Sequence, residues 1–106
     1  MTERSAELSQ AEDNLARLKN RVRMDVEKAV RKLNRAETGV ESAKRLVTAT
    51  TEARRISSDQ AEIGTANRSV LLESEASMLT AEADLLRAEY DRSVAAAELA
   101  RLTGSR

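Results

Sequence analysis

The sequence predicts an all-α protein, a long antiparallel helical hairpin that packs as a coiled coil. Three observations lead to this prediction. Small and apolar residues recur at steps of three and four along most of the 106 residues, which is the spacing of a coiled-coil seam. The chain has no proline and is 34% charged, a composition typical of long helices. One glycine, Gly64, interrupts the pattern and predicts a reversal of direction.

The first helix is expected over about residues 5–62. Two successive steps of four around Val22 insert a stutter, which locally unwinds a supercoil. Gly39 lies inside this helix, and we expect it to let a neighbouring helix approach closely. The seam is expected to follow Leu8, Ala11, Leu15, Leu18, Val22, Val26, Ala29, Leu33, Ala36, Val40, Ala43 and Val47. It is then expected to slip by one residue and continue through Leu46, Ala49, Ala53, Ile56, Gln60 and Ile63.

The turn is expected at residues 63–66 and the second helix over about residues 67–102. Thr65 or Asn67 can cap this helix by accepting a backbone N–H bond, and Gly104 ends it. It carries two adjoining apolar stripes, which predict more than one neighbour because a two-helix pair needs one seam. The expected main stripe is Leu72, Ala76, Leu79, Ala83, Leu86, Tyr90, Val94 and Ala97. The flanking set is Leu71, Met78, Leu85, Ala88, Leu99 and Leu102.

The two expected helices differ in length. A short loop makes them antiparallel neighbours, so the second helix is expected beside about residues 27–62. The first 25 residues or so then extend past it without a partner in the chain. An isolated amphipathic helix of this length is marginally stable, and we therefore expect something outside this sequence to cover it.

The composition argues against several classes of function. The chain has no histidine and no cysteine, so it lacks the usual ligands of zinc, haem and iron–sulfur clusters and the usual general base at neutral pH. We do not expect the chain to be an enzyme, and we expect no catalytic, cofactor-binding or metal-binding residues in it. No apolar run approaches the ~20 residues that span a bilayer. The opening MTERSAELSQ is polar and does not have the form of a signal peptide, so we expect the chain itself to be soluble.

Charge is divided along the chain although the formal net charge is zero. Between Arg17 and Arg35 there are eight basic and two acidic residues, whereas between Asn67 and Leu102 there are seven acidic and four basic. A nucleic-acid or lipid-binding stripe is one interpretation of the basic run. A solvated face with an acidic partner is favoured, because the run lacks the aromatic side chains that stack on bases.

Several segments together match the pattern of a known family. The corner Ile63-Gly64-Thr65 is followed by VLLESEASMLTAEADLLRAEYDRSVAAAELARLTG, residues 70–104, and preceded by VRMDVEKAVRKLNRAETGVESAKRLV. They resemble the TolC family, the outer-membrane channels of tripartite efflux pumps and type I secretion systems, over residues 8–104. The matching positions of the second helix are Leu71, Leu72, Met78, Ala81, Leu85, Ala88, Tyr90 and Leu99 through Gly104.

The resemblance implies a function. A complete family member would be trimeric and several times longer, with two such hairpins in a periplasmic helical barrel and strands in an outer-membrane β-barrel. This chain would be one hairpin, more like the second repeat, with no β-barrel part and no membrane insertion of its own. It would form part of the conduit wall. Ile63, Gly64 and Thr65 would be the tip that docks the hairpin tips of the periplasmic adaptor (membrane fusion) protein.

Two other functions stay open. The chain fits a free-standing coiled-coil interaction module that forms a dimer or a bundle to cover its apolar stripes. It could also be the hairpin of the periplasmic adaptor, whose tip carries an arginine, a leucine four residues later and a serine seven after that. Arg68 and Leu72 begin that pattern, but Leu79 stands in place of the serine. For the corner itself, the alternative is an ordinary turn with Ile63 as its last core residue.

Overall fold

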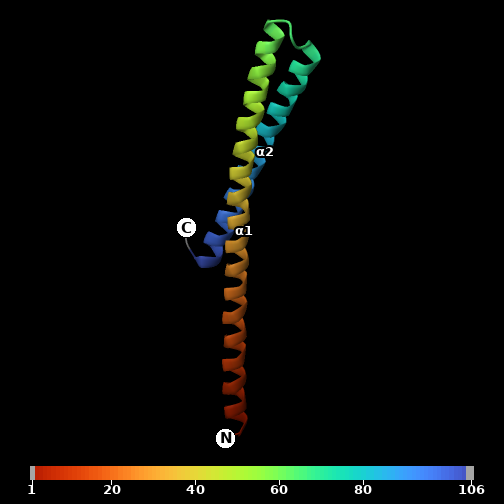
Figure 1. Cartoon of the computed structure of the whole chain (residues 1–106). Coiled ribbons are helices and arrows are strands. Elements are labelled where there is room, and N and C mark those ends of the chain that lie inside the picture. The colour runs from red at the N-terminus through yellow and green to blue at the C-terminus, as the bar shows by residue number, and fades with distance from the viewer. Residues whose placement is uncertain (1, 105–106) are drawn as a thin grey trace.

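The protein consists of two long helices that lie side by side and run in opposite directions (Figure 1). The computed structural model describes residues 2–104, in which α1 spans Thr2–Glu62 and α2 spans Arg68–Thr103, with no strand between or beside them. The molecule measures 94 × 21 × 14 Å. The expectation of an all-α helical hairpin is confirmed. The sequence predicted helices over about 5–62 and 67–102, so α1 begins three residues earlier than predicted and the other bounds differ by one residue or none.

The ends of α2 are fixed by the residues that the sequence offers there. Asn67 has an extended backbone, and its side-chain oxygen accepts the backbone N–H of Val70 at 3.0 Å, which makes it the N-cap. Gly104 adopts the left-handed conformation, with φ of 75°, and its N–H bonds to the carbonyls of Ala100 and Arg101. Between these caps no glycine or proline interrupts the helix.

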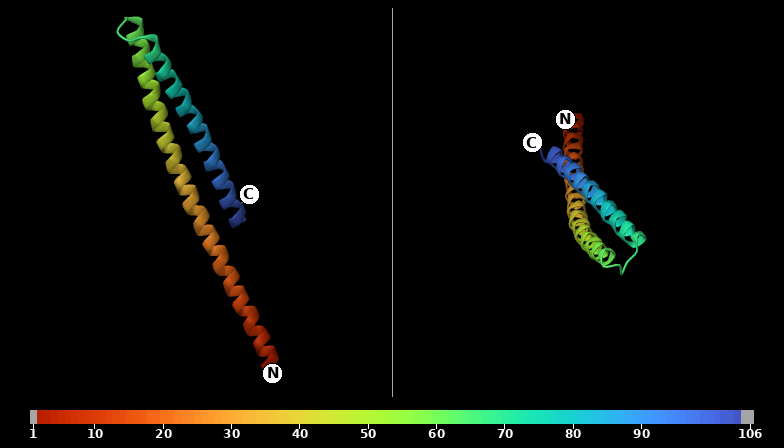
Figure 2. Two further views of the ribbon diagram at one scale, coloured as in Figure 1. Left: turned by 90° about the vertical axis from the view of Figure 1, so that its right-hand side faces the viewer. Right: turned by 90° about the horizontal axis from the view of Figure 1, so that it is seen from above.

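The N-terminal part of α1 has no neighbour in the chain. Every residue from 2 to 25 is exposed, and the first half-buried residue is Val26. Figure 2 shows the same arrangement, with α2 ending well before the start of α1. We call residues 2–25 the overhang. The sequence predicted an unpaired segment of about 25 residues, and the overhang has this length.

The seam of α1 keeps one spacing as far as the turn. Beyond Val47 the shielded positions are Thr50, Ser57, Ser58 and Ala61, in step with the preceding part. The predicted slip is wrong, because Leu46, Ala49, Ala53, Ile56, Gln60 and Ile63 are all exposed. A slip of one residue would turn the contact face of α1 by about 100°. The shielded positions of α2 show no corresponding change of face. The shielded residues of α1 up to Val47 are Val26, Ala29, Leu33, Ala36, Val40, Ala43 and Val47.

The face of α2 that contacts α1 is the one the sequence ranked second. The predicted main stripe is exposed: Leu86 and Tyr90 keep 70% and 69% of their surfaces. The flanking set and its small neighbours face α1 instead, so the ranking of the two stripes was wrong. The shielded residues of α2 include Leu71, Ser74, Met78, Ala81, Leu85, Ala88, Arg92, Ala95, Leu99 and Leu102.

The core between the helices is narrow and made of small side chains. Its fully shielded apolar residues are three alanines and one valine, and Ser57 is buried with them. Small side chains let two helix axes approach closely, while larger residues of the same face, such as Leu85 and Leu99, are half-buried beside them. The apolar core residues are Ala29, Val40, Ala81 and Ala95.

Two ion pairs connect the helices near the ends of the contact. The Lys32 Nζ lies 3.1 Å from a Glu98 carboxylate oxygen, and the Arg54 Nη2 lies 3.4 Å from one of Glu75. All four side chains keep more than a third of their surface. Exposed pairs of this kind contribute about 0–1 kcal/mol each. They mark the alignment of the helices, while burial along the seam supplies the stability.

Gly39 does not bring α1 and α2 into close approach. A methyl group placed on its Cα would have no atom within 4 Å, leaving aside the backbone of α1 itself. Gly39 is also exposed. The expectation of a tight contact at this glycine is therefore wrong.

Val40 provides a direct test of the seam. Because it is completely shielded, Val40→Ala should lower the free energy of unfolding by about 2 kcal/mol through lost burial and a residual cavity. Val30→Ala is the matched control, since Val30 is 39% exposed on the same helix and gains the same helix propensity. It should change stability by about 0.5 kcal/mol or less. Urea unfolding followed by circular dichroism measures both, and equal effects would contradict the observed seam.

Candidate functional site: the hairpin tip

The turn between the helices is a regular helix-ending motif. Gly64 has φ of 79°, and its N–H bonds to the Ala61 carbonyl at 3.2 Å. The Thr65 N–H bonds to the Gln60 carbonyl at 2.9 Å. This pair of bonds around a left-handed glycine is a Schellman motif. The Thr65 hydroxyl donates to the same Gln60 carbonyl at 3.2 Å, so this side chain is tied to the end of α1.

Ile63 lies outside the core. It is 74% exposed, the highest value among the large exposed hydrophobic residues of the described chain. The alternative in which Ile63 is the last core residue is wrong, because the last shielded residue of α1 is Ala61. Nothing in the packing of the hairpin requires an isoleucine at this corner.

The backbone of the tip offers hydrogen-bond acceptors, and no free donors, to a binding partner. The amides of Ile63, Gly64, Thr65 and Ala66 are all bonded to carbonyls at the end of α1. Their own carbonyl oxygens accept no backbone hydrogen bond from the described residues. A partner that docks here therefore meets one exposed aliphatic side chain surrounded by free carbonyl oxygens. The sequence placed Ile63, Gly64 and Thr65 together at the corner, and the structure shows them adjacent and exposed.

A charged cluster lies on α1 just before the tip. The Arg55 guanidinium donates to both carboxylate oxygens of Glu52, at 2.6 and 3.1 Å, and to Asp59 at 3.0 Å. The hydrogen bond from Arg55, followed by its positive charge, lowers the pKa of Glu52. The reciprocal bond raises the pKa of Arg55. All three side chains keep more than half of their surface exposed, and pairs with this spacing favour the helical conformation.

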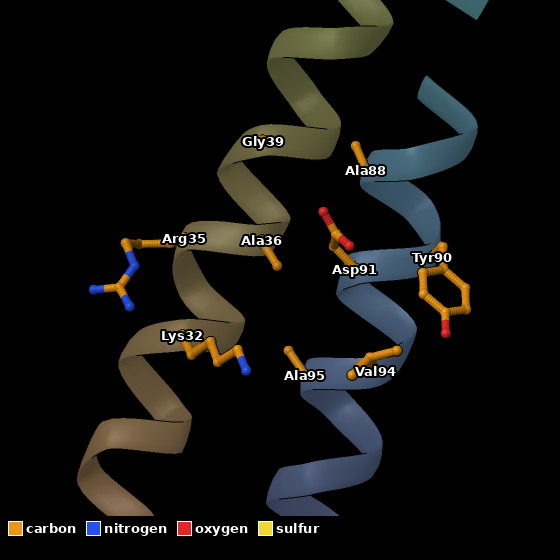
Figure 3. A pocket seen from close by; sticks show the side chains of 9 residues that line it. All are labelled: Lys32, Arg35, Ala36, Gly39, Ala88, Tyr90, Asp91, Val94 and Ala95. Atoms are coloured by element: carbon orange, nitrogen blue, oxygen red, sulfur yellow. The ribbon is translucent and has the colours of Figure 1, made fainter. Parts of the chain in front are cut away.

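A shallow groove runs between the helices farther from the tip. It has a volume of about 530 Å³, and Gly39, Ala36, Ala88 and Ala95 leave it open (Figure 3). Lys32, Arg35 and Asp91 line it as well, while the Tyr90 ring points away from α1. Among its lining residues there is one carboxylate and no histidine or cysteine.

Two apolar stripes remain uncovered on the paired part of the hairpin. Each residue of the α1 stripe up to Ile56 comes one position before a seam residue of α1, as Leu46 comes before Val47. In the α2 stripe, Leu72, Leu79 and Leu86 each come one position after a seam residue of α2. Because the helices are antiparallel and turn about 100° per residue, these offsets place the stripes on opposite faces. The α1 stripe is Leu46, Ala49, Ala53, Ile56 and Ile63. The α2 stripe is Leu72, Ala76, Leu79, Ala83, Leu86 and Tyr90.

No family model, curated protein or solved structure matches this chain. None of these comparisons tests the resemblance to TolC-family hairpins, which stays a prediction from the sequence. Within residues 2–104, no helix has the length and apolar character needed to cross a membrane. The same residues contain no group of three or more acidic side chains placed to hold a metal ion.

Sequence reasoning found the corner but missed two features of the site. The exposure of the α1 stripe was missed because its residues are more apolar than the seam positions Thr50, Arg54 and Ser57 that replace them. The Glu52–Arg55–Asp59 cluster was missed although the sequence carries its signal. Opposite charges three and four residues apart on a helix predict contact.

Glycine-to-alanine changes should have opposite signs at two positions. Gly64→Ala should destabilise the hairpin by about 1–2 kcal/mol, because an L-residue with a Cβ is strained at positive φ. Gly39→Ala should stabilise it by about 1 kcal/mol, because alanine favours the helix and the space is open. Thermal and urea unfolding measure both. A stabilising Gly64→Ala would contradict the left-handed corner.

The pKa of Glu52 should depend on Arg55. In Arg55→Ala the pKa of Glu52 should rise toward its ordinary value, as measured by side-chain carboxyl NMR shifts against pH. The pKa of Glu52 is lower in the folded protein than in the unfolded chain. The cluster therefore stabilises the fold at pH values above the ordinary pKa of Glu52, and this stabilisation is lost as pH falls through the folded-state pKa. Arg54→Ala is the control, since Arg54 pairs with Glu75. A Glu52 titration that is identical in both variants would refute the contact.

Proposed function

We propose that this chain is a wall element of a helical conduit, of the kind formed by the periplasmic barrel of TolC-like efflux and secretion channels. In this role it has no catalysis of its own and acts by packing beside other helices. The tip at Ile63, Gly64 and Thr65 docks the hairpin tips of a periplasmic adaptor protein.

The observation that carries the proposal is the pair of uncovered stripes on opposite faces. A hairpin that works alone needs apolar surface only between its two helices. Leu79 and Leu86 on one face and Leu46 and Ile56 on the other are 43–70% exposed. Contiguous apolar surface of this kind marks an interaction site in a soluble domain. A helix in the wall of a barrel has neighbours on both sides, and two such faces suit that position.

The tip supports the second half of the proposal. Ile63 is exposed without a packing role, and the carbonyl oxygens beside it are unpaired within the turn. Contact with another hairpin would shield the isoleucine and supply hydrogen-bond donors to these oxygens. Gly64 has no side chain to hold the partner away. The acceptor-rich corner thus favours a partner tip that carries arginine, lysine or amide donors.

Site-directed cross-linking tests the docking directly. Single cysteines at Ile63 and Thr65, in a chain that has none of its own, should cross-link to periplasmic adaptor hairpins several-fold more than one at Arg45. Arg45 is exposed near the middle of the paired part of α1 and belongs to neither stripe, so it controls for accessibility. Equal labelling at all three positions would refute the tip. The exposed stripes would then support a free-standing coiled-coil module.

A further inference from the structure

The overhang is an amphipathic helix with an uncovered seam. Leu8, Leu15, Leu18 and Val22 continue the spacing of the α1 seam and are 63%, 52%, 58% and 47% exposed. In the paired part, the same face of α1 contacts α2. The overhang therefore presents the surface that takes a second helix elsewhere in the molecule.

The charges of the overhang are ordered along its length. The first half, residues 3–13, carries four acidic residues and one basic residue, while residues 17–23 carry four basic residues and no acidic one. A second helix of the same sequence can satisfy this order only by running in the opposite direction, which places acidic against basic segments at both ends. The acidic residues are Glu3, Glu7, Glu12 and Asp13, and the basic ones are Arg17, Lys19, Arg21 and Arg23.

The end of α2 limits how far an incoming helix can extend. The Lys32–Glu98 pair aligns the helices, so Thr103 at the end of α2 lies beside about residue 27 of α1. An antiparallel helix on the same face can therefore cover residues 2–24 before it meets α2.

We propose that the overhangs of two copies of this chain pair antiparallel about a two-fold axis near residue 13. In this alignment Leu8 packs beside Leu18 of the second copy, and Ala11 beside Leu15 of the second copy. These are alternating layers of an antiparallel coiled coil. Glu7 flanks the seam beside Arg21 of the second copy, and the symmetry forms this ion pair twice.

A parallel pair is disfavoured by the same charges. In a parallel coiled coil, Glu7 would flank Glu12 of the second copy, twice, and the basic segments would lie against each other. The antiparallel pair has one like-charge approach, between the two Glu12 side chains near the axis. The balance of attractive and repulsive contacts therefore selects the antiparallel direction.

The pairing is argued from other residues than the conduit proposal. It uses the overhang and leaves the tip, the α1 stripe and the α2 stripe uncovered. The dimer is a rod about 150 Å long, since two molecules of 94 Å overlap by about 35 Å. A tip lies at each far end. A parallel dimer would have about the length of one chain.

Light scattering and small-angle X-ray scattering on the full chain test the proposal. We expect a concentration-dependent dimer with a maximum dimension of about 150 Å. A monomer at millimolar concentration, or a dimer of about 95 Å, would overturn the antiparallel pairing. Neither result bears on docking at the tip, which the cysteine cross-linking measures separately.

Charge reversal tests the direction of the two helices. Glu7→Arg should weaken the dimer roughly tenfold, because two attractive contacts become repulsive, and E7R/R21E should restore it. In a parallel dimer Glu7→Arg would instead strengthen association, by pairing with Glu12. Glu73→Arg, an exposed change on α2, should leave the dimer constant unchanged. If Glu7→Arg left the dimer dissociation constant unchanged, the proposal would also be overturned, because the dimer would then use another face. Circular dichroism confirms that each variant keeps its helix content.

Discussion

The close packing of small side chains between α1 and α2 holds the two helices in one alignment, and the other features of the molecule follow from it. Alanines fill most of the buried positions, and Val40 is the largest completely shielded side chain. Each alanine buries little apolar area, so the stabilisation comes from repetition along about 36 residues of paired helix. The two interhelical ion pairs are exposed and add little to it.

The fully buried centre of the seam is built from small residues, and several large ones stay exposed beside it. Leu46 and Ile56 on one face and Leu79 and Leu86 on the other lie outside the contact between the helices. The hairpin measures 21 × 14 Å across, so the apolar surface outside the seam is available to other helices. This is the physical basis of the proposed structural role in an assembly, in which the corner lies at one end and the uncovered overhang at the other.

The hairpin itself could be predicted from the sequence because its determinants are local. Gly64 specifies the reversal, Asn67 is a strong N-cap, and the difference in helix length produces the overhang. The choice between neighbouring apolar stripes could not be predicted in the same way. Ranked by hydrophobicity, Leu72 exceeds Ser74 and Ile56 exceeds Ser57, yet the serines are shielded and the larger residues exposed. Which face is inward depends on how closely two distant segments can approach, and this is a property of the pair rather than of either helix. Ile63 was ambiguous for the same reason.

Distance measurement across the hairpin tests the central claim most directly. Spin labels at Arg45 and Asp84, both exposed, lie at matching heights on α1 and α2. In a chain diluted with unlabelled protein, the paired seam predicts a separation on the order of 20 Å, label arms included. An unbroken rod through residue 64 would place the labels about 58 Å apart, and that distance would contradict the account.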